Sequence, residues 1–448
     1  MKKLRQPTFA SASLSIAIAG LSIAGLILSF AAPAFAQGHD DNPDFPAIAF
    51  DHPAIQYSES APADPIARLQ KRMDAGQGKL AYDAKWGYLP AILKALDINV
   101  DSQMLVFSRT SSQVGLISME TPRAIYFNDH TSIGYVQRSH ALEVVSIDPK
   151  LGAVFYTFDN SPPDSATGDA KLSFSQQFMN CLQCHMSPAT LNVPGIVVSS
   201  AKPLNDYTPF GGGGAFATDH RLPLATRWGG WYVTGEHGKL RHRGNTPVDY
   251  NPFSKNPEQT QNLASLADIF DTSGYLAPSS DIVALLTIEH QTRMTNLLLR
   301  LGWETRVAIQ EKTVPEFAPR LKANVEELVT YMLFADEEPF PDRITGNSTF
   351  TKTFAQRGPR DQQGRSLRDF DLQHRMFKHP LSYMIYSETF DALPDVARDA
   401  VYRRLYDVLT GTHEGEEFSA LNEADRKAVY EIVRDTKKGL PEYWKTAK

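Results

Sequence analysis

The chain has 448 residues, a formal net charge of −6 and only two cysteines. This acidity argues against nucleic acid and against an anionic membrane surface as partners, because both attract basic faces. Hydrophobic residues make up 42% of the chain, which is enough for a substantial folded core.

The first 36 residues have the pattern of a secretory signal peptide. Three basic residues precede an apolar run over residues 14–32, and an A-x-A cleavage pattern ends at Ala36. Cleavage after Ala36 predicts an exported, periplasmic protein. The alternative is an uncleaved membrane anchor, since the run is nearly long enough to span a bilayer. Membrane attachment is expected only in that case.

Residues 37–66 are rich in proline and predict an extended leader. The following region, residues 67–257, is expected to be β-rich, after short helices over 67–80 and 87–98. Its five runs of β-branched and aromatic residues are separated by turn residues, which is typical of an antiparallel meander. These runs are 104–108, 124–128, 133–137, 142–147 and 153–158.

Both cysteines lie in one motif, Cys181-x-x-Cys184-His185, at the end of a helix expected over 172–185. Cys-x-x-Cys-His is the attachment signature of a c-type haem. A thioredoxin-like disulfide is the alternative for Cys-x-x-Cys alone, whereas a structural zinc site would need more ligands. The motif predicts one covalently attached haem c, with Cys181 and Cys184 as thioether positions and His185 as the proximal iron ligand.

The second ring nitrogen of His185 needs an acceptor that fixes the imidazole. We expect a backbone carbonyl from the loop LNVPG, nine or ten residues further along the chain. Pro194 would stiffen that loop.

The sixth iron ligand separates an electron carrier from a catalyst, since small carriers supply a Met or a second His. No Met lies between Met186 and Met294, which excludes a compact His/Met haem domain directly downstream. His290 lies in an apolar helical stripe and is a candidate sixth ligand; Met294 is an alternative one turn later. The other interpretation of His290 is a hydrogen-bonded core histidine.

His237 and His242 are further alternatives for the sixth ligand. They belong to an aromatic segment, 226–245, in which we expect a β-hairpin turning at residues 235–238. Aromatic side chains suit the wall of a haem pocket. The competing interpretation is ordinary sheet packing, with both histidines exposed in a polar turn.

The last part of the chain, residues 258–448, is expected to be helical and packed on the β-rich part. Helices are expected over 279–300, 324–336, 395–411 and 422–438, with Ser280 and Asn422 as N-caps. The predicted fold class is α+β, with a haem-bearing antiparallel meander followed by helices. It is not that of a small all-α cytochrome c.

Residues 357–375 contain five arginines interleaved with aspartates. Such a run usually forms local ion pairs on a solvated face. The alternatives are an anionic substrate or bidentate pairing with haem propionates, for which the candidates are Arg360, Arg365 and Arg368.

Several ordered segments between residues 103 and 444 resemble one family. They include MLVFSRTSSQ, TPRAIYFND, DPKLGAVFYTF, NCLQCH, RWGGWYVTGEHG, SDIVALLTIEHQTRM, RGPRDQQGRSLRDFDL and SYMIYSETFDALP. Together they are similar to a family of large exported bacterial proteins described as cytochrome c domain-containing. The resemblance implies one c-type haem on Cys181, Cys184 and His185, and β and helical parts that belong to one unit. It implies no substrate.

These observations lead to three hypotheses. The first is a periplasmic monohaem c-type cytochrome in electron transfer, with a redox protein or a small-molecule electron donor or acceptor as its partner. The second is a haem-dependent oxidoreductase with an open sixth iron position, acting on peroxide, oxygen or a small molecule. The third is a haem-based sensor or binding module.

Overall fold

A computed structural model describes residues 47–108, 111–163, 172–202, 214–247, 260–412 and 415–446. The predicted signal peptide, 1–36, and the first ten residues of the predicted leader lie outside these ranges. The described residues all belong to one compact unit. None of their helices is both long and apolar enough to cross a membrane.

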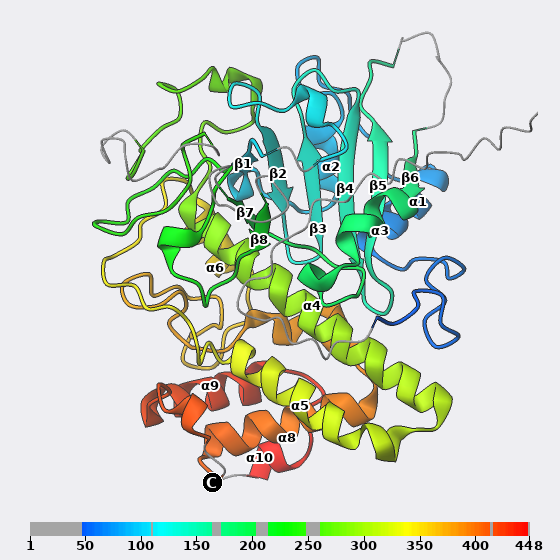
Figure 1. Cartoon of the computed structure of the whole chain (residues 1–448), viewed down its shortest axis with the longest axis vertical. Coiled ribbons are helices and arrows are strands. Elements are labelled where there is room, and N and C mark those ends of the chain that lie inside the picture. Colours follow the sequence, from blue (N-terminus) through cyan, green and yellow to red (C-terminus); the bar gives the residue numbers. More distant parts are fainter. Residues whose placement is uncertain are drawn as a thin grey trace, which may run out of the picture. The chain divides into compact units, whose positions relative to one another are not determined.

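The fold is α+β, as predicted: an antiparallel sheet in the first half and helices in the second (Figure 1). The sheet has six strands in the sequential order β1-β2-β3-β4-β5-β6. Its first five strands are the five predicted runs. Their bounds are β1 Met104–Val106, β2 Arg123–Phe127, β3 Thr131–Tyr135, β4 Ala141–Asp148, β5 Gly152–Asp159 and β6 Phe174–Gln177; a separate pair consists of β7 Ser199–Ala201 and β8 Ala215–Ala217.

Ten α-helices are assigned within the described ranges, and the central one is α4, with 30 residues. The helices are α1 Pro65–Asp74, α2 Leu89–Ala95, α3 Met179–His185, α4 Ile282–Glu311, α5 Val314–Met332, α6 Phe350–Gln356, α7 Glu388–Asp391, α8 Asp395–Thr410, α9 Glu423–Thr436 and α10 Tyr443–Thr446. Asn422 caps α9 as predicted, through a bond from the Asp425 N–H.

Helices cover both faces of the sheet, because its strands alternate apolar side chains inward and outward. Helices α1 and α2 pack on one face, where Leu105, Tyr126 and Val144 are buried. On the other face, Leu182 of α3 and Leu299 of α4 pack with Phe155 of β5 (Figure 1). Helix α4 therefore lies between the sheet and the C-terminal helices.

The expected single helix over 172–185 is wrong in its first part. Residues 174–177 pair with β5 instead, and the Phe174 ring lies 4.7 Å from that of Phe158. The unpaired edge of β5 offers hydrogen bonds that override local helical preference. The helix that carries the Cys-x-x-Cys-His motif is consequently short.

The expected hairpin over 226–245 is also wrong. Trp231 forms a bridge with Val106 of β1, Thr234 with Asp281 and Glu236 with Thr345. This segment therefore pairs with distant parts of the chain and does not fold back on itself in a local turn. Its glycines allow the backbone to come close to other segments, since a Cβ on Gly230 would lie 2.7 Å from the Cβ of Ser108.

Two smaller expectations need correction. The N-cap of α4 is Asp281, whose carboxylate accepts from the Val283 N–H, whereas the Ser280 hydroxyl donates to the Tyr232 carbonyl. The described part of the leader is packed rather than simply extended. Its Tyr57 is buried, and the Tyr57 hydroxyl donates to the Ala153 carbonyl at 2.7 Å.

Candidate functional site

The Cys-x-x-Cys-His motif forms most of helix α3. Cys181 and Cys184, three residues apart, are neighbours on the helix surface, and both are half-buried free thiols. Between them Leu182 is buried against the sheet and anchors the helix. His185 ends the helix, and its ring lies 4.7 Å from the Phe155 ring of β5.

The imidazole of His185 is held by the backbone of Gly195. Its Nδ1 donates to the Gly195 carbonyl at 3.0 Å, and the Gly195 N–H donates to the His185 carbonyl at 2.8 Å. Gly195 is ten residues after His185, so the expected acceptor in the LNVPG loop is confirmed. This bond fixes the tautomer and leaves Nε2 as the nitrogen with a lone pair; Nε2 has no hydrogen-bond partner among the described residues.

The loop that carries Gly195 is fastened to the sheet and to α4. The Ala153 N–H of β5 donates to the Pro194 carbonyl at 2.9 Å. The Asn296 side chain of α4 bonds both backbone groups of Ile196, accepting at 3.1 Å and donating at 2.7 Å. The orientation of His185 thus depends on three separate elements, and no sequence pattern indicated Asn296 or Phe155 in this role.

The protonation of the motif suits metal binding better than thiol redox chemistry. Burial lowers the pKa of His185, against the effect of its bond to Gly195, so the ring is neutral near pH 7. Burial raises the pKa of the Cys181 thiol, and the Glu143 carboxylate and Cys184 act in the same direction. A reactive Cys-x-x-Cys cysteine normally has a lowered pKa. The thioredoxin-like alternative therefore finds no support in this environment.

The sheet face beside α3 is only partly covered. Residues on the opposite face of β2–β5, such as Ala124, Leu142 and Val154, are fully buried. By contrast, six side chains on the α3 side keep intermediate exposure, and we refer to them as the open sheet face. They are Arg123, Ile125, Ser132, Glu143, Val145 and Thr157.

Apolar groups of the haem motif adjoin this face. Phe178, Cys181, Met186 and Ile196 pack, half-buried, against the same cluster as Val145. A half-exposed apolar surface around two thiols and an oriented histidine matches the requirements of a covalently bound porphyrin, which needs apolar contacts over its plane. The residues present therefore fit a c-type haem.

Arg123 and Glu143 are the charged residues of the open sheet face, and sequence reasoning missed them. Arg123 Nη1 donates to Glu143 Oε2 at 3.1 Å. The sequence does contain a signal for this pair, because each charged residue lies within an otherwise apolar strand. Their meeting depends on strand register, since Gly134 of β3 lies opposite Glu143 on one side and Ile125 on the other.

His290, the candidate sixth ligand, has a partner at each ring nitrogen. Its Nδ1 lies 2.9 Å from Nδ1 of His220, and its Nε2 lies 2.8 Å from the Ser382 hydroxyl. Both nitrogens are thus engaged. Burial, and then the neighbouring His220, hold the pKa of His290 well below its usual range. The alternative interpretation, a hydrogen-bonded core histidine, describes it correctly.

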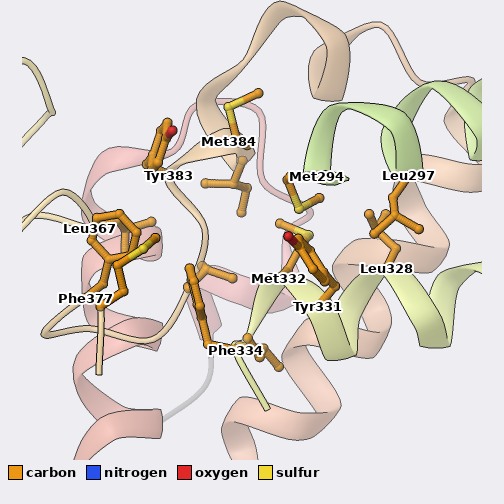
Figure 2. Close-up of a cluster of buried hydrophobic side chains, with 14 of the residues drawn as sticks. Met294, Leu297, Leu328, Tyr331, Met332, Phe334, Leu367, Phe377, Tyr383 and Met384 are labelled. Atoms are coloured by element: carbon orange, nitrogen blue, oxygen red, sulfur yellow. The ribbon is translucent and has the colours of Figure 1, made fainter. Parts of the chain in front are cut away.

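Met294 shares the face of α4 on which His290 lies. It is fully buried among α5 and the 383–384 segment, near Tyr331, Met332 and Met384 (Figure 2). Asn296, which holds the haem-motif loop, projects from nearly the opposite side of α4, because residues two apart on a helix are separated by about 200°. Met294 therefore faces the C-terminal core, on the other side of α4 from the loop that Asn296 holds.

His237 and His242 lie together but differ in their partners. His237 Nδ1 lies 3.1 Å from the Leu240 carbonyl, and its Nε2 accepts from the Asn262 N–H, so neither nitrogen is available. His242 Nδ1 accepts from the Gly244 N–H, whereas its Nε2 is buried with no partner within the described ranges. Both rings are buried rather than exposed in a turn. His242 alone keeps a nitrogen for another ligand.

The three proposed propionate arginines bind carboxylates of the chain itself. Arg360 pairs with Asp369, and Arg365 with Asp361 and Glu431. Arg360 and Arg365 thus form the local ion pairs of the other interpretation of this segment, and their role toward haem propionates stays a prediction.

Arg368, the third of these arginines, pairs with Asp129, and its guanidinium stacks 4.3 Å from the Tyr383 ring centroid. Its Nη1 is buried with no partner among the described residues. Its ion pair therefore reaches the turn between β2 and β3, while its guanidinium lies over rings of the C-terminal half, and its role toward a propionate stays a prediction.

No protein-family model, curated protein or solved structure matches this chain. Within the described residues, no group of three or more His, Cys, Asp and Glu side chains is arranged to hold a metal ion. The candidate functional site consists of the α3 motif, the Gly195 loop and the open sheet face.

Proposed function

We propose that the protein is an exported monohaem c-type cytochrome that transfers electrons. The observation that carries this proposal is the arrangement of His185: its Nδ1 is fixed by Gly195, its Nε2 has no protein partner in the described ranges, and both motif thiols lie on the same short helix. The resemblance of the sequence to exported cytochrome c domain-containing proteins supports it.

Cys181 and Cys184 would hold the haem through thioethers, and His185 Nε2 would bind its iron. When bound, the haem supplies a one-electron couple. The chain's own contribution is orientation and exclusion of water. Gly195 holds the His185 imidazole and Asn296 holds the Gly195 loop, and the apolar residues around α3 and on the open sheet face would cover the macrocycle. Partial exposure at α3, where Gln183 is exposed, leaves an edge for a redox partner.

The test is to express the full chain in a bacterial host with a cytochrome c maturation system and to measure the intact mass and the pyridine haemochrome spectrum. We expect one covalent haem per chain and a mature N-terminus at Gln37. Cys181→Ser and Cys184→Ser should each lose one thioether, and the double variant should lose covalent haem. A wild-type protein that folds and leaves the cytoplasm without covalent haem would refute the proposal.

The second candidate is an oxidoreductase with an open or displaceable sixth position. The observation that favours it is that His290, His237 and Met294 are all engaged elsewhere. His242 is the remaining nitrogen donor of that set, so His242→Ala distinguishes the cases. A low-spin spectrum that becomes high-spin in His242→Ala supports a carrier with two histidine ligands. A high-spin wild-type haem that binds carbon monoxide supports the oxidoreductase or a gas sensor.

A further inference from the structure

Arg123 reaches Glu143 across an intervening strand. The two residues lie on β2 and β4, and the strand between them contributes Gly134 at the crossing point. A Cβ at Gly134 would lie 3.4 Å from Cδ of Arg123, which is ordinary van der Waals contact, so the arginine side chain passes close to this glycine. The small residue leaves this part of the open sheet face clear for the guanidinium.

The pair is held rigidly at its acidic end. The Ser111 hydroxyl donates to Glu143 Oε2 at 2.7 Å, and the Ser112 hydroxyl donates to Oε1. The side chains of Arg123 and Glu143 are 19% and 22% exposed, so both charges are largely withdrawn from water. A fixed, largely buried ion pair is stabilising only if the remaining polar atoms of both side chains also have hydrogen-bond partners.

One of those atoms lacks a partner. Arg123 Nε is buried and makes no hydrogen bond to any residue that the structure describes, although Nη1 is bound to Glu143. A buried donor left unsatisfied is destabilising, and more so when it is charged. The Nε edge of a guanidinium is a geometry that binds carboxylates, so the missing acceptor is expected to be an anion.

The Nε edge of Arg123 lies on the same face of the sheet as the Cys-x-x-Cys-His motif. Val145, two residues after Glu143, pairs with Phe155, and the Phe155 ring contacts the ring of His185. Arg123 on β2 and Phe155 on β5 are three strands apart, about 14 Å at the usual strand spacing. Haem propionates leave the porphyrin on the side away from its thioether-bearing substituents. A propionate partner is therefore expected across the open sheet face from α3, where Arg123 lies.

We infer that the Nε edge of Arg123 binds a propionate carboxylate of the haem attached at Cys181 and Cys184. This inference rests on the proposed function. It assigns a propionate role to Arg123 in place of the 357–375 arginines, with Glu143, Ser111 and Ser112 as positioning residues. Arg123 neutralises a propionate charge near the iron and thereby raises the midpoint potential, because a nearby positive charge favours the reduced haem.

The experiment uses the mature haem protein and its Arg123→Gln, Arg123→Lys and Arg360→Gln variants. Arg360→Gln is the matched control, since it removes the same charge from an exposed pair with Asp369. Resonance Raman spectra report the propionate bending modes, and spectroelectrochemistry reports the midpoint potential. Denaturation curves establish that each variant is folded.

We expect Arg123→Gln to shift a propionate bending mode and to lower the midpoint potential. Arg123→Lys should shift the mode but keep most of the potential, and Arg360→Gln should leave both unchanged. A folded Arg123→Gln protein with covalent haem and wild-type propionate modes would overturn the inference. The inference would also be overturned if nitrite or formate perturbed the wild-type spectrum and this effect required Arg123. The acceptor of the Arg123 Nε would then be an external oxyanion. Absence of covalent haem in the wild type is a separate result, because it refutes the proposed function before any variant is compared.

Discussion

His185 and Gly195 hold each other through two hydrogen bonds, one from the imidazole to the Gly195 carbonyl and one from the Gly195 N–H to the His185 carbonyl. The second bond fixes the backbone on which the first depends. This reciprocal contact makes the imidazole orientation a property of the folded loop rather than of the Cys-x-x-Cys-His motif alone.

Gly195→Ala tests this contact. A Cβ at Gly195 would lie 2.3 Å from Asn296 Oδ1 and 3.0 Å from the Thr190 Cβ, so the loop must move away from α4. We expect a stability loss of ~1–3 kcal/mol from overpacking and an altered haem spectrum with both thioethers intact. Thermal denaturation and absorption spectroscopy measure the two effects. Gly115→Ala, with open space around the added methyl, is the control, and equal behaviour of the two variants would contradict the prediction.

His290→Phe tests the sixth-ligand expectation. The ring can keep its stacking on Tyr331 and Phe334, whereas His220 Nδ1 loses its partner and the Ser382 hydroxyl keeps only its bond from the Met384 N–H. Unsatisfied buried groups cost about 1–3 kcal/mol each. We expect a less stable protein with an unchanged haem spectrum, measured by denaturation and by absorption of both oxidation states. Conversion of the iron from low spin to high spin would restore His290 as its ligand.

The Arg227–Glu289 pair is buried between α4 and the segment that follows β8. The two side chains are 1% and 0% exposed, and Glu289 also accepts from the Thr218 hydroxyl at 2.6 Å. Burial raises the pKa of Glu289 although Arg227 acts in the opposite direction. Arg227→Met leaves a buried acid without its cation and should cost about 3–5 kcal/mol.

A double-mutant cycle provides the control for this pair. Because Arg227→Met and Glu289→Gln remove the same interaction, their effects on the unfolding free energy should sum to more than the effect of the double variant. Additive losses, measured by chemical denaturation, would show that the two charges are not coupled.

Glu337 predicts a specific pH dependence of stability. Burial raises its pKa from the ordinary 4.5 to about 7, although the Met376 N–H bond lowers it. Between these pH values the unfolded chain releases a proton that the folded protein keeps, so the unfolding free energy falls as the pH rises from 4.5 to 7. As the pH rises across this window, the unfolding free energy of the Glu337→Gln variant should increase by on the order of 3 kcal/mol relative to that of the wild type.

Denaturant titrations at pH 5 and pH 8 measure this difference. The exposed Glu59 provides the comparison, since Glu59→Gln should follow the wild type at both pH values. If the difference in unfolding free energy between Glu337→Gln and the wild type were the same at pH 5 and pH 8, the raised pKa of Glu337 would be contradicted.

The sequence by itself determined the elements whose signals are local. Runs rich in β-branched and aromatic residues, separated by turn residues, located β1 to β5, because such side chains pack well on a pleated sheet whatever the strand pairs with. Asn422 identified the start of α9 through capping geometry within four residues. The spacing from His185 to the LNVPG loop was short enough to indicate the acceptor of the imidazole.

Only the tertiary structure decided which distant side chains meet. His290 and Met294 fit a candidate ligand face on a helical wheel, yet that face packs on α5, because α4 separates the sheet from the C-terminal core. Arg123 meets Glu143 only because strand register places Gly134 between them. Hydrophobic periodicity specifies that a face is buried, but the identity of its partner depends on packing between elements far apart in the chain.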